Sequence, residues 1–298
     1  MKQLTLPQQY AVLALDGQMV GYSSVAKGAA LRCLKAAQVL EEKNALACSP
    51  AEWEKQLQKA AAAARKLKRK AAAQLEASVA ASLRDAGLLE EIPDLLGCDI
   101  NYYTSGVSLK AYRCREEDYL GIREGLRAEI LEPGEVTREC AVLLWLLRES
   151  GCIHDCFSAK EQQTLQERMT SLAAGDEFCR LLWETECHSP WQLFALRFLQ
   201  KKHNLFRNPY LEGVNLVFPF LERRKAIFID FSLLGTDVAE RRAATVAFLR
   251  EQGHRVEEVK SGTETLLKVE NAYYRIFPGA RRVYKLPVQG VNLVPVYW

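Results

Sequence analysis

Residues 50–86, PAEWEKQLQKAAAAARKLKRKAAAQLEASVAASLRDA, decide how the first part of this chain folds. Ser49 lies directly before Pro50 and three residues before Glu52, which is a capping box with proline at the first helical position. No helix-breaking residue follows until Gly87, which suits the end of a helix. We therefore predict one continuous helix over residues 50–86, roughly 55 Å long at about 1.5 Å per residue.

The apolar side of this helix is narrow. Large apolar side chains occur near its two ends, at Trp53, Leu57, Val79 and Leu83, whereas alanine dominates the middle. Alanine buries little area, and burial stabilises by roughly 25 cal/mol per Å². We therefore expect the helix to pack against its own domain through those four side chains and to leave the level of residues 65–70 exposed.

That level carries the most concentrated charge of the sequence. Arg65, Lys66, Lys68, Arg69 and Lys70 place five cations within six residues. Anionic lipid head groups bind such patches with about 1 kcal/mol per basic residue near the surface, and nucleic-acid phosphates are another candidate ligand. The alternative interpretation is a solvated helix face that binds nothing.

The chain as a whole is nearly neutral and of ordinary globular composition. It has 298 residues, 40 Lys and Arg against 37 Asp and Glu, a net charge of +3, and 49% hydrophobic residues. This composition excludes a mainly disordered chain, and the near-neutral charge argues against nucleic acid as a partner. The sequence lacks a membrane-spanning run and a convincing signal peptide, so we expect a cytoplasmic protein, peripheral on membranes at most. Nine scattered cysteines, an odd number, indicate reduced thiols.

The pattern of the sequence changes near residue 205, from helical to mixed helix and strand. Before it, amphipathic helical patterns end at glycine or proline, and the last of them begins at Ser189-Pro190. One hairpin interrupts these helices, and we expect it to pair Tyr102-Tyr103 with residues 107–109. Up to this point we predict a mainly α-helical N-terminal domain over residues 1–204.

The remaining sequence predicts a smaller C-terminal α+β module over residues 205–298. Its patterns follow a β-α-β-β order, and the helix in that order ends at Gly253. The text GVNLV occurs twice, beginning at Gly213 and at Gly290. We expect the two copies to form related edge strands that open and close the module.

Two groups of residues have types that suit metal chemistry. Cysteine and histidine ligands for zinc occur together, but at a spacing that matches no zinc ribbon or finger, so we predict structural cysteines and no metal site. These residues are Cys152, His154, Cys156, Cys187 and His188. In the C-terminal module, a nuclease would place Asp230, Glu258 and Lys260 around a divalent cation that activates water.

The N-terminal text resembles the Golgi phosphoprotein 3-like family over roughly residues 4–172. The resemblance rests on the order of four segments rather than on one motif. They are LTLPQQYAVLALDGQMVGYSS, VAKGAALRCLKAAQVLEE, SLRDAGLLEEI and the block from REGLRAEIL to LQERM. It implies a mostly helical protein on the cytosolic face of membranes, and characterised members bind phosphatidylinositol 4-phosphate and act as adaptors for membrane-protein cargo.

The lipid-binding residues of the family carry over only in part. The arginine in the family's L-R-G-G segment aligns with Lys35. Lysine keeps the positive charge but lacks the forked guanidinium of arginine. The family's tryptophan falls near Ala26, and its arginine pair falls near Ala73 and Glu76. The resemblance therefore implies the helical fold, whereas specificity for a phosphoinositide does not follow.

These observations lead to one preferred function and one alternative. We predict a noncatalytic adaptor of the Golgi phosphoprotein 3-like helical fold, without cofactor, whose partners are an anionic membrane surface or membrane-protein cargo. A homo-oligomer is a further expectation. Its lipid-binding residues would be Lys35, Arg65, Lys66, Lys68, Arg69 and Lys70. The alternative is a DNA-associated or metal-dependent nuclease that uses the C-terminal module.

Overall fold

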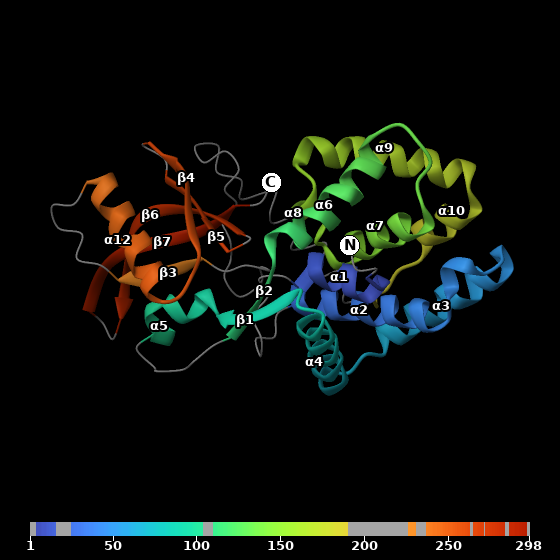
Figure 1. The fold of residues 1–298 in the computed structure, drawn as a ribbon, viewed down its shortest axis with the longest axis horizontal. Coiled ribbons are helices and arrows are strands. Elements are labelled where there is room, and N and C mark those ends of the chain that lie inside the picture. The colour runs from blue at the N-terminus through green and yellow to red at the C-terminus, as the bar shows by residue number, and fades with distance from the viewer. Residues whose placement is uncertain are drawn as a thin grey trace.

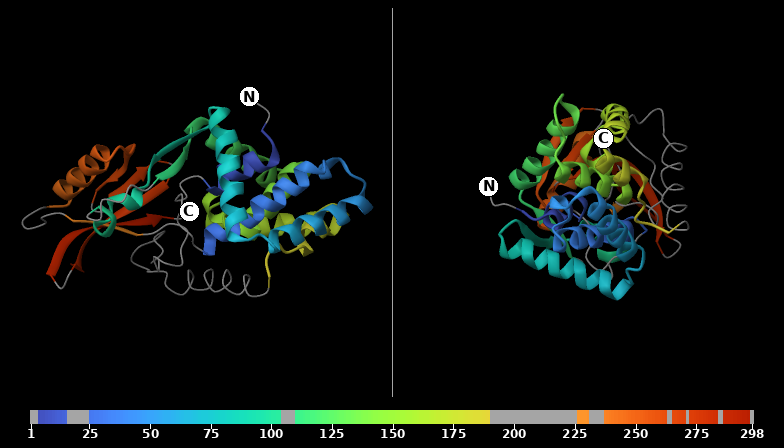
Figure 2. Two further views of the ribbon diagram at one scale, coloured as in Figure 1. Left: turned by 90° about the horizontal axis from the view of Figure 1, so that it is seen from below. Right: turned by 90° about the vertical axis from the view of Figure 1, so that its right-hand side faces the viewer.

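The computed structural model of the protein has a helical lobe and a sheet lobe, placed side by side along its longest axis (Figure 1). A short antiparallel hairpin lies between the two lobes, and Figure 2 shows it from a second direction. The residues that the structure describes are 4–15, 25–103, 110–189, 226–230, 237–262, 265–270, 272–283 and 286–296. The helix expected from Ser189-Pro190 onward, the change of pattern near residue 205 and the first GVNLV copy lie outside them.

The helical lobe is built from helices whose ends follow local sequence signals. Thr137 caps the helix that follows it by accepting a hydrogen bond from the Cys140 N–H, and this helix ends at Gly151 with a φ of 71°. Ser158 and Glu161 form a reciprocal capping box at the start of a later helix. The helices are α1 (Leu6–Leu15), α2 (Val25–Glu42), α3 (Pro50–Arg65), α4 (Arg69–Asp85), α6 (Glu116–Leu131), α7 (Arg138–Ser150), α8 (Ile153–Cys156), α9 (Ala159–Gly175) and α10 (Glu177–Glu184).

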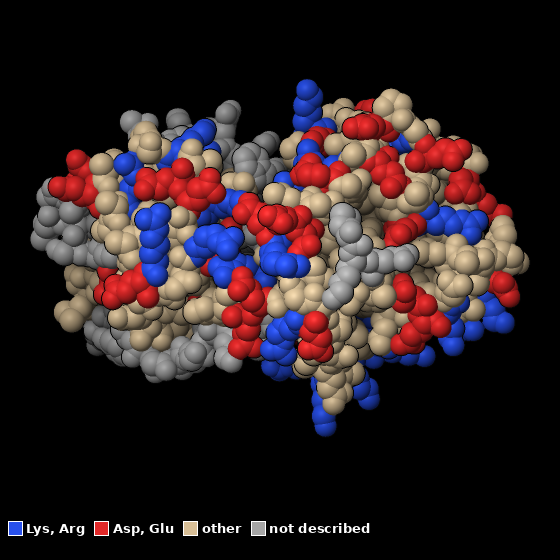
Figure 3. Space-filling model, in the orientation of Figure 1, with Lys and Arg blue, Asp and Glu red and all other residues tan. Residues whose placement is uncertain are grey.

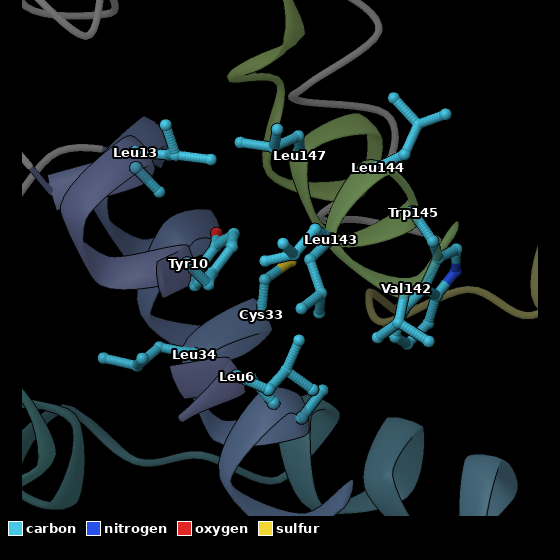
Figure 4. Packing of buried hydrophobic residues seen from close by; sticks show 14 of the residues in the cluster. Leu6, Tyr10, Leu13, Cys33, Leu34, Val142, Leu143, Leu144, Trp145 and Leu147 are labelled. Atoms are coloured by element: carbon cyan, nitrogen blue, oxygen red, sulfur yellow. The ribbon is translucent and has the colours of Figure 1, made fainter. Parts of the chain in front are cut away.

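The core of this lobe forms where α1, α2 and α7 meet (Figure 4). Most residues of α1 and α7 are buried, and residues 140–147 of α7 form an unbroken apolar run that is buried on every side. The polar atoms of their aromatic residues are satisfied inside the core. Tyr10 donates its hydroxyl to the Ala30 carbonyl at 3.1 Å, and Trp145 donates Nε1–H to the Thr185 carbonyl at 2.9 Å.

The expected continuous helix over residues 50–86 is wrong. The helix breaks at residues 66–68, where Lys68 is extended with φ −85° and ψ 154°, and α4 begins at Arg69. Two physical causes coincide at the break. Five cations in six residues repel one another on a single helix, and Leu67 turns back to pack against the core of the helical lobe.

The expected packing of this region is confirmed at its ends and at residues 65–70, where the basic side chains are exposed, but the alanines before them are buried more deeply than expected. Trp53, Leu57 and Leu83 are buried and Val79 is half-buried, as expected. The middle of α3 is buried as well, at Ala60, Ala61 and Ala64. α3 packs mainly against α2, whose buried residues Ala29, Ala30, Ala36 and Ala37 are small as well, and small side chains on both helices allow the two backbones to approach closely. Close contact between small side chains on both helices therefore buries the middle of α3, where large apolar side chains are absent.

The expected hairpin is also wrong. Tyr102 and Tyr103 belong to a short helix, α5 (Ile100–Tyr103), in which the N–H groups of both tyrosines donate to the Asp99 carbonyl. The hairpin between the lobes instead pairs β1 (Leu89–Pro93) with β2 (Lys110–Cys114) in antiparallel register. Residues 107–109, the other half of the expected hairpin, lie outside the described residues. Two 3-10 turns, η1 (Ala45–Ala47) and η2 (Leu95–Cys98), complete this part of the chain.

In the described residues, the sheet lobe is an antiparallel five-stranded sheet with one helix, α12, on a face. Its spatial order is β3-β7-β6-β5-β4, and the chain crosses from β3 to β4 through α12. The predicted β-α-β-β order is thus present and is followed by two more strands. The elements are β3 (Ile227–Asp230), α12 (Val238–Glu251), β4 (Val256–Ser261), β5 (Thr265–Val269), β6 (Ala272–Val283) and β7 (Leu286–Val296).

The second GVNLV copy does not form an edge strand, which corrects the expectation. It lies in β7, between β3 and β6. A Cβ atom at Gly290 would lie 2.2 Å from the Ile229 carbonyl oxygen, so only glycine allows β3 to approach β7 this closely.

Among the described residues, polar contacts around one small apolar contact join the two lobes. Leu95 and Cys98 of η2 pack into the apolar layer between the sheet and α12. Beside them, Asp99 accepts the Phe228 N–H of edge strand β3 at 2.9 Å and pairs with Arg281 at 3.1 Å. Further ion pairs join Arg113 to Glu270 and Glu116 to Lys268. The segment around η2, which lies between β1 and β2 in the sequence, therefore attaches the sheet lobe to these two strands.

Candidate anionic-surface binding site

The break between α3 and α4 carries the candidate site. Five side chains at this break are all exposed, and we call them the basic corner: Arg65, Lys66, Lys68, Arg69 and Lys70. The change of direction turns the run of cations from a band around one helix into a corner at the surface. Arg65 is anchored there, because its Nη1 donates to the Glu186 carbonyl at 3.1 Å.

The surroundings of the basic corner strengthen its positive charge. Lys55 and Lys59 are exposed on the preceding helix α3, and no Asp or Glu occurs anywhere between residues 55 and 75. In the space-filling view, basic side chains follow the lower edge of the molecule beneath α3 and α4 (Figure 3). The like charges reinforce one another as a binding surface for anions.

Lys35 is not gathered into this site by any contact recorded among the described residues. It is half-buried on α2, and its Nζ donates to Gln38 Oε1 one turn along the same helix at 2.9 Å. The two positions that align with the family's arginine pair hold no basic residue. Ala73 is a small exposed residue, and Glu76 is buried in an ion pair with Lys27 at 2.7 Å. A buried carboxylate there opposes an anionic head group.

The candidate nuclease residues do not converge. Asp230 lies on β3 and Glu258 and Lys260 lie on β4, which are the two opposite edges of the sheet. With strands about 4.8 Å apart, four strand spacings separate these edges by roughly 19 Å. Glu258 is instead paired with Arg242 at 2.8 Å. A single cation cannot bridge carboxylates placed in this way.

The cysteines and histidines form no cluster that could hold a metal within the described part of the chain. Cys152 and Cys156 are buried at the two ends of α8. The side chain of His154 lies outside the described residues. Cys187 and His188 are instead part of a different arrangement, which the sequence did not predict.

That arrangement is a buried polar cluster between α2, α7 and the segment after α10. It consists of Arg32, Cys33, Glu149, Cys187 and His188, and we call it the latch cluster. Its members come from three distant parts of the sequence. The local signal that could have indicated a buried polar contact is Arg32 beside Cys33, in a part of α2 where alanine and leucine predominate.

The hydrogen bonds of the latch cluster determine the state of His188. Arg32 Nε donates to His188 Nδ1 at 3.0 Å, so this nitrogen is an acceptor and has no proton. His188 Nε2 lies 2.6 Å from the Glu149 carbonyl oxygen and donates to it. The imidazole is therefore neutral, with its proton on Nε2, and both of its nitrogens are engaged.

The carboxylate and the thiol of the latch cluster are equally constrained. Glu149 pairs with Arg148 at 2.9 Å through one oxygen and accepts the Cys187 N–H at 2.9 Å through the other. Burial raises the pKa of the Cys33 thiol well above its ordinary value, and its hydrogen bond with Cys187 raises it further, against the opposing effect of His188. Cys33 is therefore a protonated thiol at neutral pH.

No protein-family model, no curated protein and no solved structure matches this chain. Among the described residues, no helix combines the length and the apolar content that crossing a bilayer requires. Inference about function therefore starts from the basic corner.

Proposed function

We propose that this protein is a noncatalytic binding protein that docks on anionic membrane surfaces through the basic corner. One observation carries the proposal: a break between two helices presents five exposed cations within six residues, in a chain whose net charge is only +3. Each basic residue near an anionic bilayer contributes about 1 kcal/mol of attraction. Five of them supply enough attraction for reversible peripheral binding.

The shape of the site favours a flat polyanionic surface over a nucleic acid. Basic side chains follow the lower edge of the molecule beneath α3 and α4 in the space-filling view, and an edge of this kind can touch a flat surface (Figure 3). Single-stranded nucleic acid would need aromatic side chains beside the cations on which its bases could stack. Residues 54–75 contain no aromatic side chain.

The resemblance of residues 4–172 to the Golgi phosphoprotein 3-like family supports the same proposal. Peripheral membrane binding is the property that this resemblance implies, and membrane-protein cargo would be the second partner. The position of Glu76, buried beside Lys27, argues that lipid is selected by surface charge and not by a phosphoinositide pocket.

Vesicle flotation tests the proposal directly. The full chain should float with vesicles of phosphatidylcholine containing phosphatidylserine, should stay behind with pure phosphatidylcholine, and should dissociate as salt is raised. Changing all five residues of the basic corner to Gln should weaken binding. If only half of the expected attraction is realised, about 2.5 kcal/mol, partition falls about 60-fold.

A matched variant separates the site from the overall charge. It removes three lysines and two arginines that are exposed elsewhere, by the changes Lys43→Gln, Lys160→Gln, Lys260→Gln, Arg255→Gln and Arg282→Gln. This variant should float nearly as well as the unchanged chain. Equal loss in both variants, or no flotation of the unchanged chain, would refute the basic corner as a membrane site. Binding of a DNA duplex in place of vesicles would assign the corner to nucleic acid instead.

A further inference from the structure

Cys33 and Cys187 are brought into contact from distant parts of the sequence. Cys33 lies in the middle of α2, facing α7 in the core (Figure 4). Cys187 lies in the irregular segment that follows α10. Both side chains are fully buried in the same core, and Arg32, next to Cys33, donates to His188, next to Cys187, at 3.0 Å. Cys187 is also one of the groups that raise the pKa of the Cys33 thiol, which agrees with this proximity. Two buried thiols side by side are the arrangement from which a disulfide forms.

The segment of residues 185–188 holds Cys187 in place by polar contacts alone. Trp145 and Arg65 donate to the carbonyls of Thr185 and Glu186. The Cys187 N–H donates to Glu149, and the following His188 ring accepts from Arg32. Because this segment is not part of a helix or strand, it can move locally without unfolding an element.

The contacts of His188 exclude metal binding by the same thiols. A metal site with two thiolates and an imidazole needs a free lone pair on one ring nitrogen. Nδ1 already accepts from Arg32, and Nε2 carries a proton that it donates to the Glu149 carbonyl. The positive charge of Arg32 further opposes a cation. With metal binding excluded, oxidation of the two thiols is the chemistry available to Cys33 and Cys187.

We propose that Cys33 and Cys187 are a reversible oxidation site, which forms a disulfide between α2 and the segment after α10. The oxidant is a small-molecule disulfide such as glutathione disulfide. When the segment opens, the Cys187 thiolate attacks one sulfur of that disulfide and releases the first thiolate. Cys33 then loses its proton, attacks the Cys187 sulfur of the mixed disulfide and releases the second. Two protein thiols are oxidised, and one small disulfide is reduced to two thiols.

The geometry assigns different roles to the two cysteines. A disulfide bond is about 2 Å long, so the sulfur atoms must approach more closely than in a hydrogen bond. Cys187 can supply this movement because it lies in an irregular segment, whereas Cys33 is held within α2. The raised pKa of Cys33 makes it the second, slower thiol, so formation should accelerate as the pH rises. The proposal does not rest on the proposed membrane docking, although Arg65 of the basic corner contacts the same segment through the Glu186 carbonyl.

Peptide mapping of the full chain tests the proposal. The native protein is incubated with glutathione disulfide, the remaining thiols are alkylated, and the digest is analysed by mass spectrometry. We expect a linked peptide pair that contains Cys33 and Cys187, and its disappearance after dithiothreitol. Absence of this pair in the oxidised native protein, or linkage of Cys187 to another cysteine, would overturn the proposal.

Two variants sharpen the measurement. Cys187→Ser should abolish the linked pair and leave Cys33 as a thiol. Cys48→Ser changes a half-exposed cysteine outside the pair, and the link between Cys33 and Cys187 should form as in the unchanged chain. Loss of the link in Cys48→Ser would show that Cys48 relays the oxidation and would overturn direct formation. The unchanged chain decides the question even if a variant fails to fold.

Discussion

The helical lobe and its joint with the sheet lobe are held by different forces. Inside the helical lobe, α1 and α7 bury most of their residues, and apolar contact dominates. At the joint, Asp99, Arg113 and Glu270 carry the contact through hydrogen bonds and ion pairs, beside a small apolar patch from η2. The stability of a packed core falls when buried side-chain volume is removed, whereas the stability of a polar joint falls when a charge or hydrogen bond is removed. Substitutions in the two regions should therefore have separable effects.

The largest expected effect tests the packed core. Trp145→Ala removes a fully buried indole from α7 together with its hydrogen bond to the Thr185 carbonyl. Deleting a buried aromatic side chain costs about 3–5 kcal/mol, because a cavity remains. Chemical unfolding followed by circular dichroism should show this loss, while Lys160→Ala, at an exposed site on α9, should change stability by less than about 0.5 kcal/mol. Equal stability of both variants would contradict a core centred on α7.

An intermediate effect is expected at the joint. Asp99→Ala leaves the Phe228 N–H of β3 without its acceptor and Arg281 without its carboxylate. An unsatisfied buried donor costs about 1–3 kcal/mol, so hydrogen exchange at the Phe228 amide should accelerate about 5- to 150-fold.

A surface aspartate provides the control for this prediction. Asp118 also pairs with an arginine, Arg115, but on the exposed side of α6, so Asp118→Ala should leave β3 exchange unchanged. If Asp99→Ala leaves the Phe228 amide equally protected, the joint does not depend on this carboxylate, and the contrast between the two regions is lost.

The smallest effect is a pH dependence of the same joint. Burial acts to raise the pKa of Glu270, but His254, Arg113 and the Arg255 N–H outweigh it and lower that pKa below its ordinary value of 4.5. A carboxyl group with a lowered folded-state pKa stabilises above its unfolded pKa and loses this contribution as the pH falls through the folded value. The joint should therefore weaken below about pH 4.5.

Comparison with a neutral variant isolates this contribution. Stability to urea should fall more steeply between about pH 6 and pH 3.5 in the unchanged chain than in Glu270→Gln, which has no charge to lose. Parallel pH profiles would mean that Glu270 contributes nothing to the acid sensitivity.

Local signals of the sequence mark several of the helix ends. Thr137, Ser158 and Asp237 all cap the helices that follow them, and Gly151 and Gly253 adopt the positive φ that ends a helix. Each of these signals acts between residues a few positions apart, so the chain forms it without distant partners. The exposure of the basic corner follows from the same local reasoning, because five clustered cations resist burial.

The errors occurred where distant contacts decide. The break between α3 and α4 depends on Leu67 reaching the core, and the small residues of α3 are buried because α2 offers small residues in return. The separation of Asp230 from Glu258 depends on the order of the strands. A stretch of ten or twenty residues does not indicate any of these contacts, because each joins segments that are distant in the sequence.

The sequence by itself determined the class of each region, the caps of its helices and the position of its cations. Only the tertiary structure decided that the basic run forms a corner, that the suspected nuclease residues lie on opposite edges, and that Cys33 meets Cys187. The physical reason is the range of the forces involved. Capping and charge repulsion act along the chain, whereas packing and buried hydrogen bonds join residues that become neighbours only after folding.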